Sequence, residues 1–564
     1  MNFTNFMNSI NSKISHIFLF LILFLRFPAM VTAQEETTKT FNISKSLSIF
    51  NAVLRELDMY YVDTLKHEKM VKSAIDYMLN NLDPYTVYIP EAETEDITFM
   101  TSGEYGGIGA IITKTEDGIC ISEPYEGMPA QKYGLKAGDI ILEIDGEKTA
   151  DFSVSEASSK LKGTPNTEIK LKIERSGHKK PFEKKFLREK IHIPPISFSK
   201  IVAPGIGFIL LNDFTEQASL ELKNTIMDMQ AKNHIESLIL DLRGNGGGLI
   251  DEAVKIMGYF VPKGTEIVST KGKIPQASYT YRTPLDPIFP DMKLAVLVNN
   301  ASASASEILA GAVQDLDRGI VIGERTFGKG LVQNIRPVSY GGHVKVTTAK
   351  YYIPSGRCIQ AIDYAQRKDD GSLRRIPDSL SQVFKTKSGR IVRDGGGIIP
   401  DSITQDERKL NIAYYIYAKN LYFSFANRYA AEHVTIPKPE EFKLTDQDFD
   451  DFVTFIKAKN FTYTPQTKEY FDELYNFSKL EGLDKEAKAE FEALREKLLP
   501  DIDVKLRENK DEILNLLGVE IIKRYYYQKG AIAYSLIDDK DLKVAVELLN
   551  NQVEFLALLQ KGMQ

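Results

Sequence analysis

Tryptophan is absent from this chain of 564 residues, and cysteine occurs only twice, at Cys120 and Cys358. Two thiols are too few for a disulfide framework, a four-thiolate zinc site or an iron–sulfur cluster. An excess of either charge is also missing, because 71 Lys and Arg residues stand against 77 Asp and Glu residues, for a formal net charge of -6. The composition therefore gives no global electrostatic preference for nucleic acid.

The amino-terminal segment lacks an apolar run of the about 20 residues that a membrane-spanning helix needs. Lys13 precedes a short apolar run from Ile17 to Leu25, Pro28 interrupts the pattern, and the small residue Ala33 ends it. This order is typical of an export signal. We predict a signal peptide over residues 1–33, cleaved after Ala33, and an exported protein. The alternative is an uncleaved anchor, which would keep the protein associated with the membrane.

The chain as a whole has the composition of a multidomain globular protein. Its 43% apolar and 26% charged residues are ordinary values, and at about 150 residues per domain there is room for three or four domains. Four sequence patterns follow one another along the chain. Apolar residues have helical spacing over 44–82 and again beyond 401, short apolar runs lie between glycine turns over 106–189, and strand and helix patterns alternate over 200–325. The alternating region predicts crossover connections around a core sheet, with chemistry at the strand ends.

Local patterns predict individual elements. Apolar and charged residues alternate over 169–173, which indicates a half-buried strand. Apolar residues at i, i+3, i+4 and i+7 from Phe449, behind a capping residue at Thr445, predict a helix. Residues 541–549 predict another helix near the carboxyl terminus.

A run of small residues, Asn299 to Ile308, follows an apolar strand and opens a helical pattern. A serine at a helix amino terminus lies where backbone amides and the helix dipole stabilise developing negative charge. Ser302, Ser304 and Ser306 are therefore candidate nucleophiles. Taken alone, the segment favours a flexible turn that ends in a capping serine.

A second motif, Gly323 to Gly330, differs by one residue from the phosphate-binding pattern G-x-x-x-x-G-K-[ST]. Gly330 has no hydroxyl to bind magnesium, and Leu331 to Ile335 has the pattern of a strand rather than a helix. We therefore expect that this motif does not bind a nucleotide. Lys329 is then expected to have a role other than phosphate binding.

A nucleophilic serine needs a base, and two residues could supply it. His343 lies in a glycine turn without a recognisable acidic partner pattern. Lys329 could act if its pKa fell by about 3 units, worth about 4 kcal/mol, which burial can supply. Ser304 with Lys329 is a coherent pair, and a Ser–His hydrolase that uses His343 is the alternative.

A third motif runs from Asp241 to Leu249 and contains the consecutive glycines Gly246, Gly247 and Gly248. Glycines free backbone N–H groups to point into a site, as an oxyanion hole requires. A plain strand-to-helix turn would have the same pattern.

In this order, these motifs resemble those of the carboxyl-terminal processing peptidases, or tail-specific proteases, of the S41 serine peptidase family, over about Leu47 to Asp401. The family's serine–lysine spacing matches Ser304 and Lys329. The resemblance further implies that Gln333 orients the lysine and that the amide of Ala305 joins one of the glycines in the oxyanion hole. Two residues depart from the common pattern, Asn300 before the Ser-Ala repeat and Tyr85 where histidine is usual.

The resemblance implies a multidomain α/β fold: a crotonase/ClpP-like βα protease core, an inserted or preceding PDZ β-sandwich domain, and helical regions at both ends. The expected boundaries are 34–104 for the amino-terminal helical region, 105–190 for the PDZ domain, 191–404 for the peptidase core and 405–564 for the carboxyl-terminal helical domain. Within the PDZ domain, the resemblance assigns binding of a peptide carboxylate to Gly107, Ile108 and Gly109. The long carboxyl-terminal extension resembles that of periplasmic members from Gram-negative bacteria.

The function implied is a serine endopeptidase that recognises protein or peptide carboxyl termini and cleaves through an acyl-enzyme, without a metal or other cofactor. The expected partners are substrates with free carboxyl termini and not nucleic acid or nucleotide. Whether the protein also binds an adaptor protein or forms a homo-oligomer stays open. A catalytically inactive, exported PDZ scaffold is the alternative reading.

Overall fold

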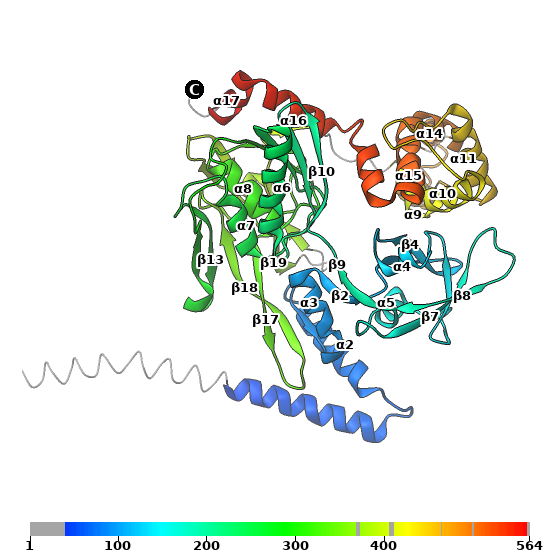
Figure 1. Ribbon diagram of the computed structural model, residues 1–564. Coiled ribbons are helices and arrows are strands. Elements are labelled where there is room, and N and C mark those ends of the chain that lie inside the picture. Colours follow the sequence, from blue (N-terminus) through cyan, green and yellow to red (C-terminus); the bar gives the residue numbers. More distant parts are fainter. Residues whose placement is uncertain (1–39, 368–372, 405–410, 464, 499–500, 561–564) are drawn as a thin grey trace, which may run out of the picture. The chain divides into compact units, whose positions relative to one another are not determined.

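The computed structural model describes residues 40–367, 373–404, 411–463, 465–498 and 501–560. The predicted signal peptide over 1–33 lies outside them. The chain divides into two units, Met1–Asn81 and Leu82–Gln564. The described part of the first unit holds a helix over residues 40–60 and α2 (His67–Asn80), shown in blue in Figure 1. Among the described residues, no helix combines the length and apolar character needed to cross a membrane.

The second unit begins with β1 (Val87–Ile89) and α3 (Thr94–Ser102), which lead into a small β domain. Its sheet has the strand order β3-β4-β5-β7-β8, with β6 paired to β5, and a separate ladder joins β2 to β9. In β7 the residues Ile169, Leu171 and Ile173 are fully buried, which confirms the predicted half-buried strand. The elements are β2 (Glu104–Gly107), β3 (Ala110–Thr115), β4 (Gly118–Pro124), α4 (Pro129–Lys132), β5 (Ile140–Ile144), β6 (Glu147–Lys148), α5 (Val154–Leu161), β7 (Glu168–Glu174), β8 (Phe182–Leu187) and β9 (Glu189–His192).

A six-stranded sheet forms the next core, in the order β10-β11-β12-β15-β16-β23. All neighbours are parallel except β10 and β11, so crossover helices cover the sheet, as the alternating sequence predicted. Helices α6, α7 and α8 pack on one face (Figure 1). The elements are β10 (Ile196–Ala203), β11 (Ile206–Leu211), α6 (Ala218–Asn233), β12 (Ser237–Asp241), α7 (Ile250–Met257), β15 (Lys293–Val298), α8 (Ala305–Asp315), β16 (Ile320–Gly323) and β23 (Ser402–Ile403).

The other face of this sheet is covered by the end of the chain. Leu542, Ala545 and Leu548 of α16 (Lys540–Asn550), with Phe555 of α17 (Gln552–Gln560), pack against buried residues of β11, β12, β15 and β16. The predicted helix over 541–549 is confirmed as α16. Sequence position places α16 in the predicted 405–564 region, but its packing partners belong to the peptidase core.

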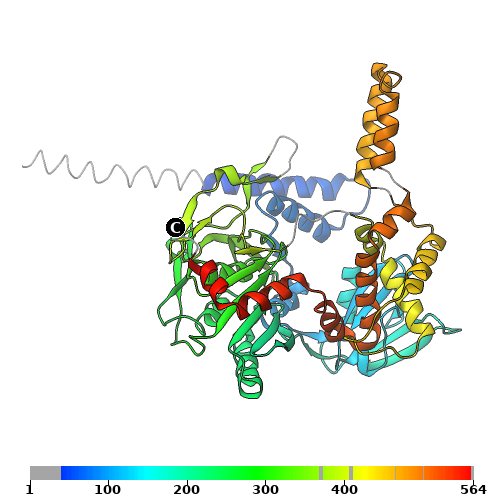
Figure 2. The same cartoon turned by 90° about the horizontal axis from the view of Figure 1, so that it is seen from above.

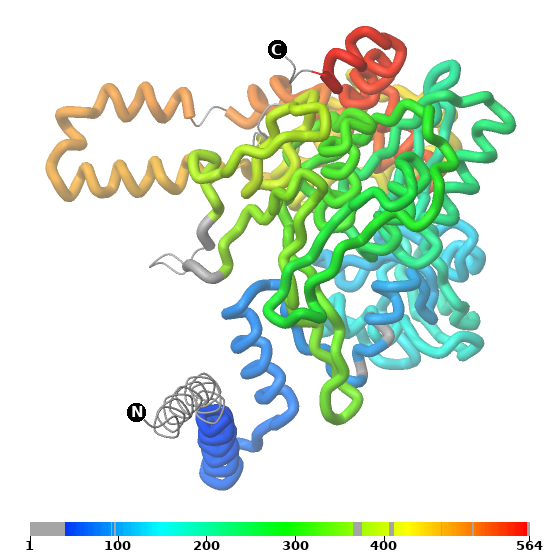
Figure 3. Tube along the Cα trace, turned by 90° about the vertical axis from the view of Figure 1, so that its left-hand side faces the viewer, coloured from blue at the N-terminus to red at the C-terminus, as the bar shows by residue number. Residues whose placement is uncertain are grey.

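A second sheet in the order β1-β18-β13-β14, with β17 paired to β18, carries a long hairpin. The hairpin consists of β17 (Leu331–Pro337) and β18 (His343–Tyr352), which agrees with the strand patterns read from the sequence. Figure 3 shows it as an extended green loop. The sheet also contains β13 (Glu266–Gly272) and β14 (Tyr279–Arg282). Two separate two-stranded sheets pair β19 (Ile362–Arg367) with β20 (Leu373–Arg375) and β21 (Val383–Lys385) with β22 (Ile391–Arg393).

Helices α9, α10, α11, α14 and α15 build a separate apolar core. The predicted helix near Phe449 is confirmed as α11, and Thr445 and Asp448 cap it reciprocally. Figure 2 shows α12 and α13 side by side as an orange hairpin, held by contacts among Phe471, Tyr475 and Phe491. The helices are α9 (Ile412–Ala418), α10 (Leu421–Glu432), α11 (Asp446–Ala458), α12 (Gln466–Glu481), α13 (Lys488–Leu498), α14 (Ile502–Glu508) and α15 (Lys510–Ser535).

Candidate active site

Ser304 stands immediately before α8, where the loop after β15 turns into the helix. Its backbone has φ 56° and ψ -115°, a conformation that residues with a side chain rarely adopt. A strained residue at a strand-to-helix turn is a common way to present a nucleophile. Ser304 is partly exposed, whereas the hydroxyls of Ser302 and Ser306 are buried and donate to the carbonyl oxygens of Leu242 and Asn245. The geometry thus distinguishes Ser304 from its two neighbours.

Glu307 connects the serine and lysine segments, a role that the sequence analysis did not assign. Its fully buried carboxylate accepts hydrogen bonds from the amide of Ser304 at 2.9 Å and from the amide of Lys329 at 2.9 Å. The amide of Gly328 and the hydroxyl of Thr326 also donate to it, at 2.7 and 2.6 Å. Burial raises the pKa of Glu307, and these donors oppose that shift because they stabilise the charged form.

Lys329 lies two residues before β17 and is partly buried. Burial, aided by the charge of Lys345, lowers its pKa from 10.5 to about 8 against the opposing effects of Glu307 and Asp83. The Nζ atom lies 4.4 Å from the ring centroid of Tyr85, the residue that departs from the usual histidine. A substantial fraction of this amine is therefore neutral near pH 8, as a general base requires.

Tyr351 makes a second connection between the two segments. Its buried hydroxyl donates to the carbonyl oxygen of Lys329 at 2.6 Å and lies 3.2 Å from the carbonyl oxygen of Ser304. Among the described residues, no hydrogen bond joins Ser304 Oγ to Lys329 Nζ. The structure brings their backbones together, and the direct contact of the dyad stays a prediction.

The glycine loop after β12 lies against the serine. A Cβ built on Gly247 would lie 2.7 Å from Ser304 Cβ and 2.9 Å from the amide nitrogen of Ala305. The amide of Gly247 itself donates to Asn245 Oδ1 at 2.8 Å, so it is already occupied. Within the described chain, the amides of Gly246, Gly248 and Ala305 donate to no protein group. They are therefore available for an oxyanion, and the predicted hole stays untested.

Gln333 lies on β17, and its amide donates to Thr347 Oγ1 at 3.1 Å. His343 lies on β18 opposite Pro337, at the other end of the hairpin from Lys329. At about 3.3 Å per strand residue, this places His343 about 20 Å from the lysine end. The position disfavours the alternative base.

Of the predicted carboxylate-binding residues, Gly107 ends β2, and Ile108 and Gly109 connect it to β3. Gly109 has φ 71°, and a Cβ there would lie 2.4 Å from Met128 Cβ, so only glycine fits. Ile108 is buried in the core of this domain. Strand β3 pairs with β4 on one side only, which leaves its other edge open to an added strand.

Sequence reasoning missed Glu307, Tyr351 and Asn245. The Ser-x-x-Glu pattern of Ser304 and Glu307 is a helix-capping signal that could have indicated Glu307. No local pattern indicates Tyr351, which reaches the site only because β18 folds back along β17. The described residues contain no group of three or more His, Cys, Asp or Glu side chains able to hold a metal ion.

Family models define the class of this protein as a peptidase. Residues 205–366 match Peptidase family S41, residues 96–174 match the PDZ domain, and residues 412–549 match the family described as Probable PDZ-protease, C-terminal helical domain. The chain belongs to peptidase family S41, with a PDZ domain and a carboxyl-terminal helical region, so the expected fold class is confirmed.

Named relatives agree with this assignment. The carboxy-terminal-processing protease of Bartonella bacilliformis is 37% identical over 343 residues, which are 60% of this chain and 78% of that protein. The probable CtpA-like serine protease of Staphylococcus aureus is 35% identical over 316 residues, 56% of this chain and 62% of that protein. Among solved structures, the photosystem II D1 C-terminal processing protease matches at 29% identity and a TM-score of 0.33, over 54% of this chain and 88% of that one.

Proposed function

We propose that this protein is a serine endopeptidase that binds the carboxyl termini of protein or peptide substrates through its PDZ domain and cleaves with a Ser304–Lys329 dyad. The observation that carries the proposal is the Glu307 carboxylate, which accepts from the amides of both residues at 2.9 Å. One buried group thus joins the backbone at the proposed nucleophile to the backbone at the proposed base. Hydrogen bonds within catalytic pairs are often long before substrate binds, so the contact tightens in the complex.

The chemistry proceeds in two steps. Neutral Lys329 takes the proton from Ser304 Oγ, which attacks the carbonyl carbon of the scissile bond, and the amides of Ala305 and of Gly246 or Gly248 hold the resulting oxyanion. The lysine returns the proton to the leaving amine, which departs and leaves the acyl-enzyme. Lys329 then deprotonates a water that attacks the ester, and the acid product leaves as Ser304 regains its proton.

The dyad is tested by replacing each member. Ser304→Ala and Lys329→Ala should each abolish cleavage of an unfolded protein substrate, while circular dichroism and thermal melting stay as in the wild type. A fluorophosphonate probe should label the wild type and not Ser304→Ala. Full activity in either variant would disprove the assignment, and an unlabelled wild type that still binds peptides would favour the inactive scaffold.

The PDZ role is tested with matched peptides. A peptide with a free, apolar carboxyl terminus should be cleaved faster than the same peptide with an amidated end, because the turn from Gly107 to Gly109 offers its amides to a carboxylate. Equal rates would remove this recognition role.

We also propose export to the periplasm. Cleavage after Ala33 predicts that the mature protein, isolated from a Gram-negative host, begins at Gln34. Amino-terminal sequencing checks this, and an intact amino terminus in the membrane fraction would support the anchor instead.

A further inference from the structure

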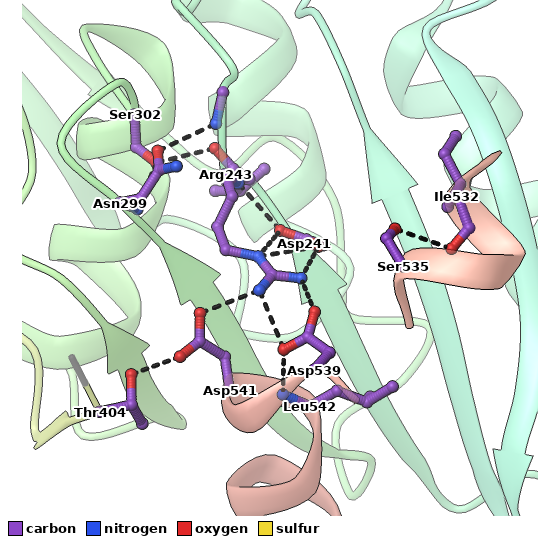
Figure 4. A network of polar contacts seen from close by, with 12 residues as sticks. Asp241, Arg243, Asn299, Ser302, Thr404, Ile532, Ser535, Asp539, Asp541 and Leu542 are labelled. Atoms are coloured by element: carbon purple, nitrogen blue, oxygen red, sulfur yellow. Dashed lines mark hydrogen bonds and ion pairs between the residues drawn. The ribbon is translucent and has the colours of Figure 1, made fainter. Parts of the chain in front are cut away.

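Arg243 directly precedes the glycine loop that lies against Ser304, and it is held by three carboxylates (Figure 4). Asp241, at the end of β12, accepts from its Nε and from one terminal nitrogen at 2.6 Å. Asp539 accepts from both terminal nitrogens, at 2.7 and 3.1 Å, and Asp541 accepts from one at 2.9 Å. The guanidinium fork is thus fixed in direction as well as in position.

Two of these carboxylates come from the far end of the sequence. Asp539 is the N-cap of α16, and its Oδ1 also accepts from the amide of Leu542 at 2.9 Å. Asp541 is buried and accepts from the hydroxyl of Thr404, which follows β23. Since α16 is packed on the core sheet, both side chains are anchored to a rigid support.

Charge balance alone does not require Asp539 and Asp541. Asp241 already neutralises Arg243, and two additional carboxylates leave a local excess of negative charge. Burial lowers the pKa of Arg243, and attraction and hydrogen bonds from Asp241 and Asp539 outweigh that effect and raise it. What Asp539 and Asp541 add is a fixed geometry for the fork.

The loop that follows needs such an anchor. Gly244, Gly247 and Gly248 all have positive φ, so the loop gains little rigidity from its own side chains. Its far end is fixed where the amide of Phe214 donates to the Gly247 carbonyl oxygen and the amide of Leu249 donates to the Phe214 carbonyl oxygen. Its near end is fixed by Arg243 and by the Gly244 amide, which donates to Asn299 Oδ1 at 3.0 Å.

We propose that Asp539 and Asp541 are positioning residues for catalysis: through Arg243 they hold the glycine loop in the geometry that receives the oxyanion. The inference rests on the proposed function for its kinetic consequence and on the observed contacts for its structural one. It makes α16 a part of the active-site support and gives the carboxyl-terminal helices a role in the chemistry itself.

The test uses the full chain with Asp539→Asn/Asp541→Asn. Asparagine keeps an oxygen that can cap α16 and accept from Thr404, but it removes both charges from Arg243. The matched control is Asp538→Asn, because Asp538 is exposed at the same end of the helix and, within the described part of the chain, forms an ion pair only with Lys543.

We expect kcat of the double variant to fall about tenfold with KM within about twofold, since loss of an oxyanion donor acts on the transition state. The inhibition constant of a peptide aldehyde, whose adduct carries the same oxyanion, should rise by a similar factor. Asp538→Asn should behave as the wild type. An unchanged kcat, or a rise in KM without a fall in kcat, would overturn the proposal.

Hydrogen exchange separates this inference from the proposed function. Amides over residues 242–250 should exchange faster in the double variant, whereas those of β7 should not change. This holds whether or not the wild type cleaves peptides. Unchanged exchange over 242–250 would overturn the proposal, while faster exchange in a protein that never reacts at Ser304 would support the anchor and disprove the dyad.

Discussion

At the scale of single residues, the site depends on buried groups that control charge. Lys329 can act as a base only when neutral, and its surroundings lower its pKa to about 8. Glu307 opposes this shift while fixing the backbone on both sides of the reaction. The two residues therefore have separable effects, one on the pH profile and one on geometry.

Proteolysis should increase with pH through about 8, because a lowered pKa leaves Lys329 protonated below this value and neutral above it. Lys345→Met removes a nearby positive charge, so the pKa of Lys329 should rise and the profile of kcat/KM should move to higher pH. Lys350→Met, an exposed change on the same strand, should leave the profile in place. An unchanged pH profile of kcat/KM in Lys345→Met would contradict this account.

Glu307→Gln should lower stability by about 1–3 kcal/mol, because a buried amide would direct its NH2 group at some of the four donors that now face a carboxylate. Activity should fall further than stability explains, since the Ser304 and Lys329 amides lose their common acceptor. Urea denaturation and labelling by a serine-reactive probe measure the two effects. Glu216→Gln, an exposed change, serves as control, and equal behaviour of the two variants would refute the role of Glu307.

At the scale of elements, the glycine loop and the start of α8 must approach closely. Gly247→Ala should reduce probe labelling of Ser304 by about a hundredfold, because its Cβ would lie 2.7 Å from Ser304 Cβ and its φ of 109° disfavours alanine. Gly246→Ala retains the amide and meets nothing within 4 Å. It should therefore lose much less activity, and a Gly247 variant that is labelled at the normal rate would show that the loop can move aside.

Several individual elements were predictable because their signals are local. The period-two pattern over 169–173, the capping residue Thr445 and the strand pattern after Gly330 each act within a few residues, and each matches an observed element. The contacts of Glu307 with Lys329 and of Arg243 with Asp539 join residues far apart in sequence. They depend on how whole elements pack, which no single-sequence pattern reports.

At the scale of the whole molecule, segments of the carboxyl-terminal region differ in how much they contribute to the packing of the peptidase core. Helix α16 buries Leu542, Ala545 and Leu548 on the peptidase sheet, whereas α12 and α13 pack mainly on each other. Position in the sequence gave no means to tell them apart.

Two deletions test this difference. Ending the chain after Ser535 should expose one apolar face of the core sheet and yield insoluble protein, because burial of each large apolar side chain is worth about 1.5–3 kcal/mol. Replacing residues 466–498 by a short Gly/Ser linker should leave the melting temperature of the core within a few degrees. Soluble, active protein from the first deletion would contradict the packing described.

Because α16 and α17 follow every other described element, the sheet stays bare on one side until synthesis has passed residue 560. A chain still being synthesised would thus hold Ser304 without the finished support of its sheet. On the proposed mechanism, the glycine loop would reach its anchored geometry only after these last helices dock.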